Sequence, residues 1–281
     1  MDVIGGVIAR VDRHSPLWSY RLHWRRARRE DLALRVVDAF VSRGDVVVDI
    51  GASRGLFCSR MRDLVGPAGA VHAFEPNPEH HERLRSLAAH GRVRLHPVAL
   101  SDHEGQATLH VPLIDGRAYT GWASLEEHPH EAAQAVAVPT HRLDDVLGSE
   151  ERVSFIKCDV EGHEDAVMRG ARELLARSRP GVLVEIEQRH RSAEVAEAFA
   201  EFLAVGYEGW ALFPDGLRPL EEFELQRDQL AFLGGPPSGE VMPHGYVHNF
   251  LFLAPGTDVR SLLDRAAVES AAGRSSSSTR A

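Results

Sequence analysis

The stretch from Gly44 to Gly55 constrains the fold more than any other part of the sequence. It opens with a turn, continues as an apolar run rich in β-branched residues (Val46 to Ile50), and ends in a loop with two glycines. A short run of this kind, bounded by turn residues, is typical of a buried parallel strand. The residues that follow, Leu56 to Leu64, have helical spacing. Strand, glycine turn and helix together predict the first unit of a nucleotide-binding α/β domain.

The spacing of the glycines indicates what kind of ligand the turn binds. A dinucleotide-binding turn should carry G-x-G-x-x-G, with the helix start facing a pyrophosphate. Here Asp49 precedes Gly51, Ser53 stands where the second glycine would be, and Gly55 closes the turn. An acid there repels a pyrophosphate but suits an ammonium group, such as the methionine end of S-adenosylmethionine (SAM). On this stretch alone, an ordinary strand-to-helix turn in an unrelated α/β protein is the alternative.

Two further strands are expected to end in acids. Val71 to Glu75 is predicted to be the second strand, and Glu75 lies 20 residues after Gly55. An acid at this distance is placed to accept both ribose hydroxyls of a bound nucleoside. Val93 to Leu100 is predicted to be the third strand, after which Asp102 could accept from an adenine amino group.

A second informative stretch runs from Val153 to Glu164. Its first six residues are predicted to form the fourth strand, with Asp159 at the strand tip, where α/β sheets bind ligands. Glu161 and His163 fill the following turn, and a helix is expected to continue to about Ala176. The fifth strand is predicted at Val182 to Glu187, again ending in acids.

The remaining segments are assigned by pattern. Short strands are expected at Gln106–Val111 and Ala135–Pro139, and the mixed residues 112–134 are expected to form a loop over the site. Tyr207–Phe213 and Val247–Leu253 are predicted to pair antiparallel at one edge, and residues 214–246 to be largely loop. A helix capped by Asp31 is expected at 32–41.

Three regions are therefore expected. Residues 1–43 form an Arg-rich helical extension, residues 44–255 the α/β domain, and residues 256–281 a tail that is largely disordered from about residue 266. Three interpretations of the extension are open: it packs on the domain, it covers the site, or it binds a partner or a membrane surface.

Composition excludes several classes of protein. A hydrophobic fraction of 43% and a charged fraction of 26% fit a soluble globular protein. The net charge of −9 argues against nucleic-acid binding as the main task. Cys58 and Cys158 are too few for a disulfide framework. Without a long apolar segment, no membrane span or secretory signal is expected, and a cytoplasmic enzyme is the default.

Seven segments occur in a characteristic order: Val48–Ala52, Phe74–Pro78, Ala99–Asp102, Leu143–Asp145, Lys157–Glu164, Glu185–Glu187 and Asn249–Phe252. Together they resemble the FkbM family of SAM-dependent methyltransferases. The resemblance covers about residues 44–253, with Ser53 in a place where members usually carry Asn. It implies a Rossmann-like class I methyltransferase fold: a seven-stranded, mostly parallel sheet with helices on both faces and an antiparallel edge. It also implies SAM as cofactor and O-methylation of a hydroxyl on a natural product, a sugar or a lipid-like metabolite.

The expected site follows from these segments. His163 is the first candidate for a general base because it titrates near neutrality, with Asp159 and Glu161 as competitors. Mg²⁺ held by Asp159, Glu161, Glu185 and Glu187 is possible, but structural acids without a metal are favoured. The residues expected to bind the cofactor are Asp49, Gly51, Ser53, Gly55, Glu75, Pro76, Ser101, Asp102 and Asp159.

Other functions remain open at this stage. A small-molecule hydroxyl acceptor and a possible homo-oligomer are expected, but N-methylation of an amine fits the same fold. A NAD(P)-dependent oxidoreductase is disfavoured because the chain lacks G-x-G-x-x-G and a Tyr-x-x-x-Lys pair; its sole lysine is Lys157. A non-catalytic SAM-binding protein that uses the Arg-rich extension is the third possibility.

Overall fold

The computed structural model describes residues 32–89, 91–114, 116–127, 132–233 and 245–259, together with positions 243, 261 and 263. Residues 1–31 of the expected extension (residues 1–43) and the expected tail from about residue 266 lie outside this part of the chain. None of the helices within the described ranges has the length and apolar composition that a bilayer crossing requires.

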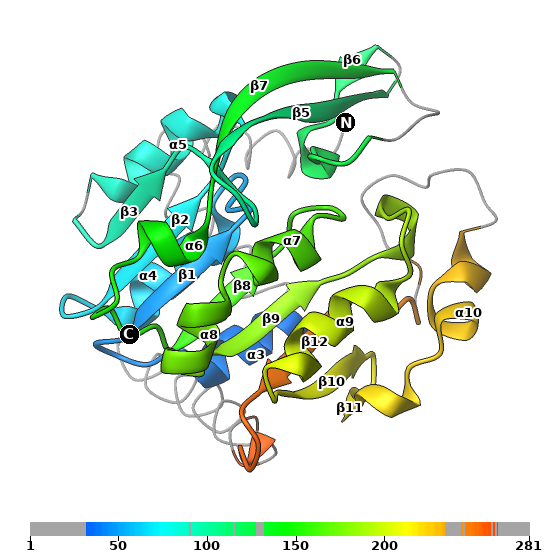
Figure 1. Ribbon diagram of the computed structural model, residues 1–281. Helices are drawn as coiled ribbons and strands as arrows, with labels where there is room; N and C mark the ends of the chain where they lie inside the picture. Colours follow the sequence, from blue (N-terminus) through cyan, green and yellow to red (C-terminus); the bar gives the residue numbers. More distant parts are fainter. Residues whose placement is uncertain are drawn as a thin grey trace, which may run out of the picture.

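The main sheet has eight strands in the order β11-β10-β12-β9-β8-β1-β2-β3 (Figure 1). The five strands from β9 to β3 are parallel, and β12 pairs antiparallel with both β9 and β10. Their bounds are β1 Val46–Ile50, β2 Ala70–Phe74, β3 Val93–His96, β8 Phe155–Cys158, β9 Gly181–Glu185, β10 Glu208–Phe213, β11 Gly216–Pro219 and β12 Asn249–Leu253.

Helices cover both faces of this sheet, as expected. Alternate side chains of β1 separate into two cores: Val47 packs in the cluster that includes α3 and α4, and Val48 packs in the cluster that includes α7 to α9. The helices are α3 Leu32–Phe40, α4 Leu56–Val65, α5 Pro78–Ala88, α6 Leu143–Val146, α7 Glu164–Arg169, α8 Arg172–Ser178, α9 Val195–Ala204 and α10 Leu225–Asp228. Single turns are η1 Thr120–Trp122, η2 Gln188–His190, η3 Leu220–Glu222 and η4 Leu230–Phe232.

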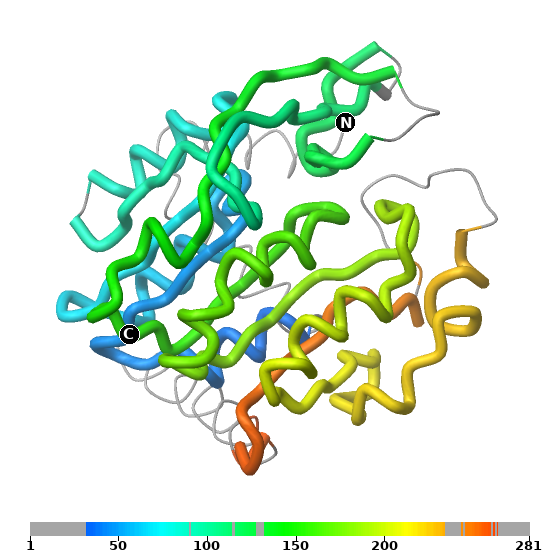
Figure 2. The backbone as a smooth tube through the Cα atoms, viewed as in Figure 1, coloured from blue at the N-terminus to red at the C-terminus, as the bar shows by residue number. Residues whose placement is uncertain are grey.

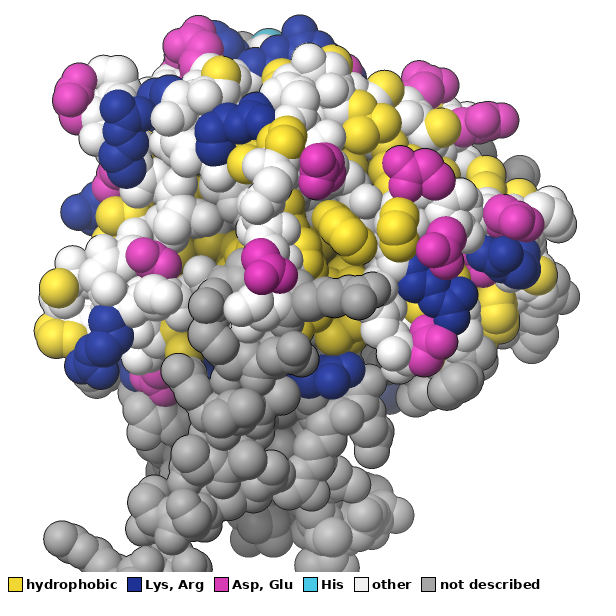
Figure 3. Space-filling view, turned by 90° about the horizontal axis from the view of Figure 1, so that it is seen from below, with side chains coloured by type: hydrophobic (Ala, Val, Ile, Leu, Met, Phe, Trp, Pro, Cys, Tyr) yellow, Lys and Arg dark blue, Asp and Glu magenta, His cyan; other side chains and the backbone are white. Residues whose placement is uncertain are grey.

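A second sheet, in the order β4-β7-β5-β6, arches over the end of the main sheet where β1 and β2 finish (Figures 1 and 2). Its strands are β4 Ala99–Leu100, β5 Gly105–Ile114, β6 Arg117–Ala118 and β7 Ala133–His141. The opposite end of the molecule carries basic and acidic side chains intermixed, with hydrophobic side chains between them (Figure 3). At the arch, β5 and β7 lie above the strand tips (Figure 1).

Three expectations need correction. Within the described residues the main sheet has eight strands rather than seven, because the chain turns back at Pro214-Asp215 and adds β11 outside β10. The third predicted strand is divided into β3 and β4 around Pro97, which has no N–H to donate to a ladder. The helix predicted to reach about Ala176 breaks into α7 and α8 at Gly170, where a Cβ atom would lie 2.0 Å from the carbonyl oxygen of Ser101.

Candidate functional site

A cleft of about 700 Å³, partly open to solvent, lies at the carboxyl ends of β1, β2 and β8, under the arch. Topology explains the position: parallel strands end at one edge of a sheet, and their loops meet there. The ends of β1, β2 and β8 and the loops that follow them contribute these cleft-lining residues: Ile50, Gly51, Ser53, Phe74, Glu75, Pro76, Asp159, Val160, Glu161 and His163. Thr120, Gly121, Ala123 and Leu125 line it from the arch, and we call residues 120–126 the acceptor wall.

The glycine turn after β1 is built by close packing against β8. Gly51 has a φ of +74°, and a Cβ atom there would lie 1.8 Å from the carbonyl oxygen of Asp159. Ser53 also has a positive φ, of +46°, and Gly55 begins α4 in the left-handed conformation. The turn therefore presents backbone rather than side chains to the cleft at Gly51.

Glu75 connects the first and second strand loops. Its Oε2 accepts the backbone N–H of Ser53 at 2.6 Å, and its Oε1 accepts that of Asn77 at 2.7 Å. These bonds fix the carboxylate at the cleft wall. Each oxygen keeps a further lone pair, so both can accept the hydroxyls of a vicinal diol. Glu75 and the glycine turn thus fit the nucleoside part of SAM.

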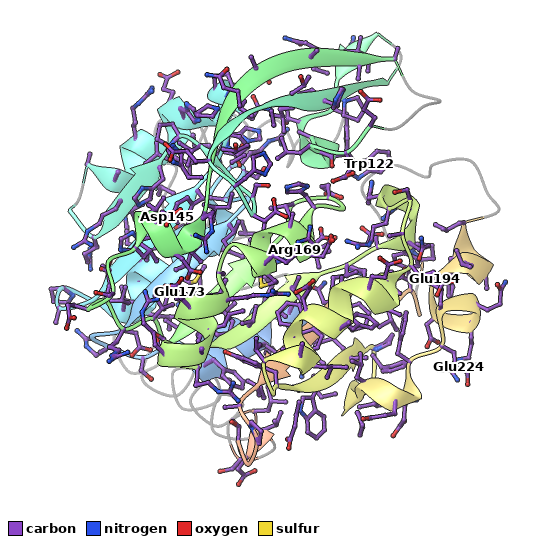
Figure 4. The ribbon with its side chains drawn as sticks, in the orientation of Figure 1. Trp122, Asp145, Arg169, Glu173, Glu194 and Glu224 are labelled. Atoms are coloured by element: carbon purple, nitrogen blue, oxygen red, sulfur yellow. The ribbon has the colours of Figure 1, made fainter. Side chains whose placement is uncertain are left out.

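Two other acids of the predicted cofactor set lie outside the cleft lining. Asp49 is buried beneath the glycine turn, and burial raises its pKa to about 7 against the opposing charge of Lys157. Its Oδ2 has no hydrogen-bond partner among the described residues. Asp102 instead bonds His103 and the Nε of Arg169 on α7 (Figure 4), and these bonds lower its pKa to about 2. Roles for both in cofactor binding remain predictions.

The tip of β8 holds a charge cluster around a buried lysine. The ammonium of Lys157, 1% exposed, lies 3.6 Å from Asp159 and 4.0 Å from Glu185. Burial raises the pKa of Asp159 to about 6, and Glu185 adds to the effect. The ammonium of Lys157 thus supplies the positive charge beside both carboxylates.

A neighbouring cluster joins Glu161 to η2. His190 Nε2 lies 3.0 Å from Glu161 Oε2 and 3.9 Å from Glu187 Oε1. These three residues each offer a ligand atom within 4.8 Å of the others, so the group is the closest approach to a metal-ligand set among the described residues. Glu187 is further held by Tyr246, whose hydroxyl donates at 2.6 Å, and by Arg189. Burial, then Asp159, Glu185 and Glu187, raise the pKa of Glu161 well above its usual range.

His163 stands at the start of α7 and lines the cleft. Its Nδ1 is 2.8 Å from Oε1 of Glu126, and its Nε2 is 3.0 Å from Oγ of Ser101. Ser101 itself is buried and is not among the cleft-lining residues, so the structure places it next to Nε2 of His163 rather than beside the glycine turn. All three predicted catalytic residues, His163, Asp159 and Glu161, line the same cleft as Glu75.

Several residues near the cleft had no sequence signal. The Trp122 ring lies 6.1 Å from the His190 ring, and the guanidinium of Arg189 lies over Trp122 at 5.5 Å (Figure 4). Ser124 and Glu126 contact the turn after β8. All of these residues lie outside the strand tips, in segments without hydrophobic periodicity. The local sequence pattern therefore could not predict that they lie near the cleft.

Comparison with known proteins is consistent with this geometry. The family model described as "Methyltransferase FkbM domain" matches residues 49–208. The 2-O-methyltransferase NoeI of Sinorhizobium fredii (strain NBRC 101917 / NGR234) is 29% identical over 159 residues, which are 52% of this chain and 65% of that relative. The chain thus spans less than two thirds of that relative's length.

Solved structures show weaker likeness. The methyltransferase FkbM from Methylobacillus flagellatus KT has a TM-score of 0.45 and 18% identity, over 74% of this chain and 43% of that one. The Aeropyrum pernix fibrillarin, in complex with natively bound SAM, has a TM-score of 0.44 and 16% identity, over 76% of this chain and 68% of that one.

Proposed function

Because the chain belongs to the FkbM family of SAM-dependent methyltransferases, we propose that it methylates a hydroxyl group of a small molecule, such as a natural product or a sugar, with His163 as general base. Membership in this family argues against the alternative that the chain is a nicotinamide-dependent oxidoreductase. The name of one relative, a 2-O-methyltransferase, favours oxygen as the acceptor atom.

The cofactor is SAM, which when bound supplies a methyl group open to in-line displacement from its sulfonium. In our proposal Glu75 accepts the ribose hydroxyls, and Gly51 and Ser53 bring the backbone close to the cofactor. Asp159, at the tip of the neighbouring strand, attracts the positively charged methionine end.

One observation carries the proposal: His163 lines the same cleft as Glu75 and the glycine turn. An alcohol is a poor nucleophile until its proton is removed, and a positioned imidazole contributes typically about 10²–10⁴-fold to such a reaction. In our proposal the cleft also holds the acceptor oxygen in line with the methyl group, and such alignment supplies a large part of the remaining acceleration.

N-methylation of an amine is the second candidate. Asp159 also lines the cleft, and its carboxylate attracts a protonated amine. Binding of that charged form would hold the amine in its unreactive state, so we place the hydroxyl acceptor first.

The experiment is a transfer assay with methyl-labelled SAM and matched acceptors. Each pair consists of a hydroxyl compound, sugars included, and the corresponding amine, and the methylated atom is located by NMR. We expect label on oxygen in at least one pair. Label that appears only on nitrogen would replace the proposal with N-methylation, and SAM binding without transfer to any acceptor would favour a non-catalytic role.

A further inference from the structure

The acceptor wall is attached to the turn that carries His163 by a short chain of hydrogen bonds. Ser124 Oγ donates to the carbonyl oxygen of Glu161 at 2.5 Å, and the backbone N–H of Glu126 donates to the same Oγ at 3.0 Å. Ser124 is buried, so this link is shielded from water. The backbone of Glu126 is therefore fixed relative to the residues that lead into α7.

The side chain of Glu126 completes this link. Its Oε1 lies 2.8 Å from Nδ1 of His163, across 37 positions of the sequence. The bond to His163 lowers the pKa of Glu126, so the group is a carboxylate near neutral pH and can only accept. Nδ1 of His163 must then carry a hydrogen atom.

That assignment leaves one ring nitrogen with a lone pair. In the neutral ring, Nε2 accepts the hydroxyl of Ser101 at 3.0 Å. His163 is thus held between a carboxylate from the arch and a hydroxyl that follows β4, with a side chain only 15% exposed. Two partners on opposite nitrogens fix both the tautomer and the ring plane.

We propose that Glu126 is a positioning residue for the reaction: it holds the Nδ1–H of His163 and thereby makes Nε2 the atom that takes the proton of the acceptor hydroxyl. This inference rests on the proposed function of His163. When the acceptor binds, the hydroxyl of Ser101 turns to Oδ1 of Asp102, 3.5 Å away, and the acceptor hydroxyl takes its place at Nε2. The acceptor oxygen bonds the methyl group as the sulfonium C–S bond breaks, its proton passes to Nε2, and His163 then releases that proton to solvent. Because Glu126 belongs to the acceptor wall, the same segment that lines the cleft also orients the base.

The competing interpretation is a surface ion pair. The side chain of Glu126 is 40% exposed, and exposed pairs contribute little to stability. The two interpretations differ in a measurable way: a surface pair changes thermal stability only, whereas a positioning residue acts on catalysis through His163 and through no other group.

A double-mutant cycle separates them. The variants are Glu126→Ala, Glu126→Gln, His163→Ala and the double variant Glu126→Ala/His163→Ala, with the neighbouring, exposed Glu127→Gln as the matched control. With an acceptor from the transfer assay, we expect kcat of Glu126→Ala to fall about ten-fold or more at unchanged SAM affinity. Glu126→Gln should lose less, because its amide oxygen still accepts, and the double variant should be no slower than His163→Ala. A kcat of Glu126→Ala within about two-fold of wild type, or losses that multiply in the double variant, would overturn the proposal.

A second readout does not depend on activity. In ¹⁵N-histidine NMR, with the His163 signals identified from the His163→Ala spectrum, we expect the Nδ1–H tautomer in wild type and a mixture of tautomers in Glu126→Ala. If no acceptor is methylated on oxygen, the proposed function fails, while this spectrum still tests the link between Glu126 and His163. An Nε2–H tautomer in wild type would contradict the inference directly.

Discussion

The Nζ atom of Lys157 lies 3.6 Å from Oδ2 of Asp159 and 4.0 Å from Oε2 of Glu185. Burial alone lowers the pKa of this lysine, but the carboxylates of Asp159 and Glu185 outweigh burial and raise it above its usual value. The ammonium is therefore charged, and it lies beside two of the acids that the sequence pattern indicated as weak metal ligands.

Removal of metal ions should leave methyl transfer unchanged, because Lys157 already supplies the positive charge at the strand tips. The measurement is the initial rate after dialysis against a chelator, with and without added Mg²⁺. A loss in chelator that Mg²⁺ restores would contradict this prediction. It would also point to Glu161, Glu187 and His190 as ligands, since their ligand atoms lie within 4.8 Å of one another.

Replacement of Glu75 should weaken SAM binding. Its carboxylate accepts the backbone N–H groups of Ser53 and Asn77 and faces the cleft, so Glu75→Ala removes both a ribose acceptor and the bond that holds the glycine turn. Hydrogen bonds to a charged group contribute roughly 1.5–3 kcal/mol, so we expect at least about a ten-fold rise in the Kd measured by calorimetry. Glu82→Gln, exposed on α5, is the control and should bind SAM like wild type.

Replacement of His163 should separate catalysis from cofactor binding. His163→Ala removes the proposed base but no contact of the glycine turn, so kcat should fall about 10²–10⁴-fold while the Kd for SAM stays within about two-fold. Single-turnover rates and calorimetry measure the two effects. Equal rates for wild type and variant would assign the base to Glu161 or Asp159 instead.

Much of this arrangement follows from local patterns. Apolar runs bounded by turn residues located β1, β2, β8 and β9, and because parallel strands end at one edge, Glu75, Asp159 and His163 could be placed together from the sequence. The same reasoning did not show that Asp102 lies outside the cleft lining. A strand tip predicts where a side chain starts, but not that Arg169, 67 positions later, draws it away from the cleft.

The contacts of the arch could not be predicted for a different reason. Ser124 and Glu126 belong to a segment without helical or strand periodicity, and their partners on the turn after β8 lie 37 positions away. Pairing over such a distance depends on how the second sheet folds over the first. The same applies to His190, whose approach to Glu161 follows from a single turn after β9.

The buried carboxyl of Asp49 should make stability depend on pH. Its pKa is raised by burial from 3.8 to about 7, so the folded protein keeps a proton that the unfolded chain loses between about pH 4 and 7. This contribution to stability is therefore present at low pH and is lost as pH rises through 7. Asp49→Asn cannot ionise. We therefore expect the free energy of unfolding of the variant, relative to that of wild type, to rise by on the order of 1–3 kcal/mol from about pH 5 to about pH 8. Urea unfolding of both proteins at the two pH values measures the change; a constant difference would contradict it.

The contact between Gly51 and Asp159 should make the glycine turn intolerant of any side chain. In Gly51→Ala, the new Cβ would lie 1.8 Å from a backbone oxygen of Asp159, which cannot rotate away, and the residue would keep a φ of +74°. Gly44→Ala is the matched control, since Gly44 has a φ of +91° but no atom within 4 Å of the place its Cβ would take. Both variants carry a left-handed cost of about 1–2 kcal/mol, but only Gly51→Ala must also separate the end of β1 from the end of β8. We therefore expect the melting temperature of Gly51→Ala to fall well below that of Gly44→Ala, with loss of SAM binding in the former alone. Equal melting temperatures would mean that the two strand ends are not in contact.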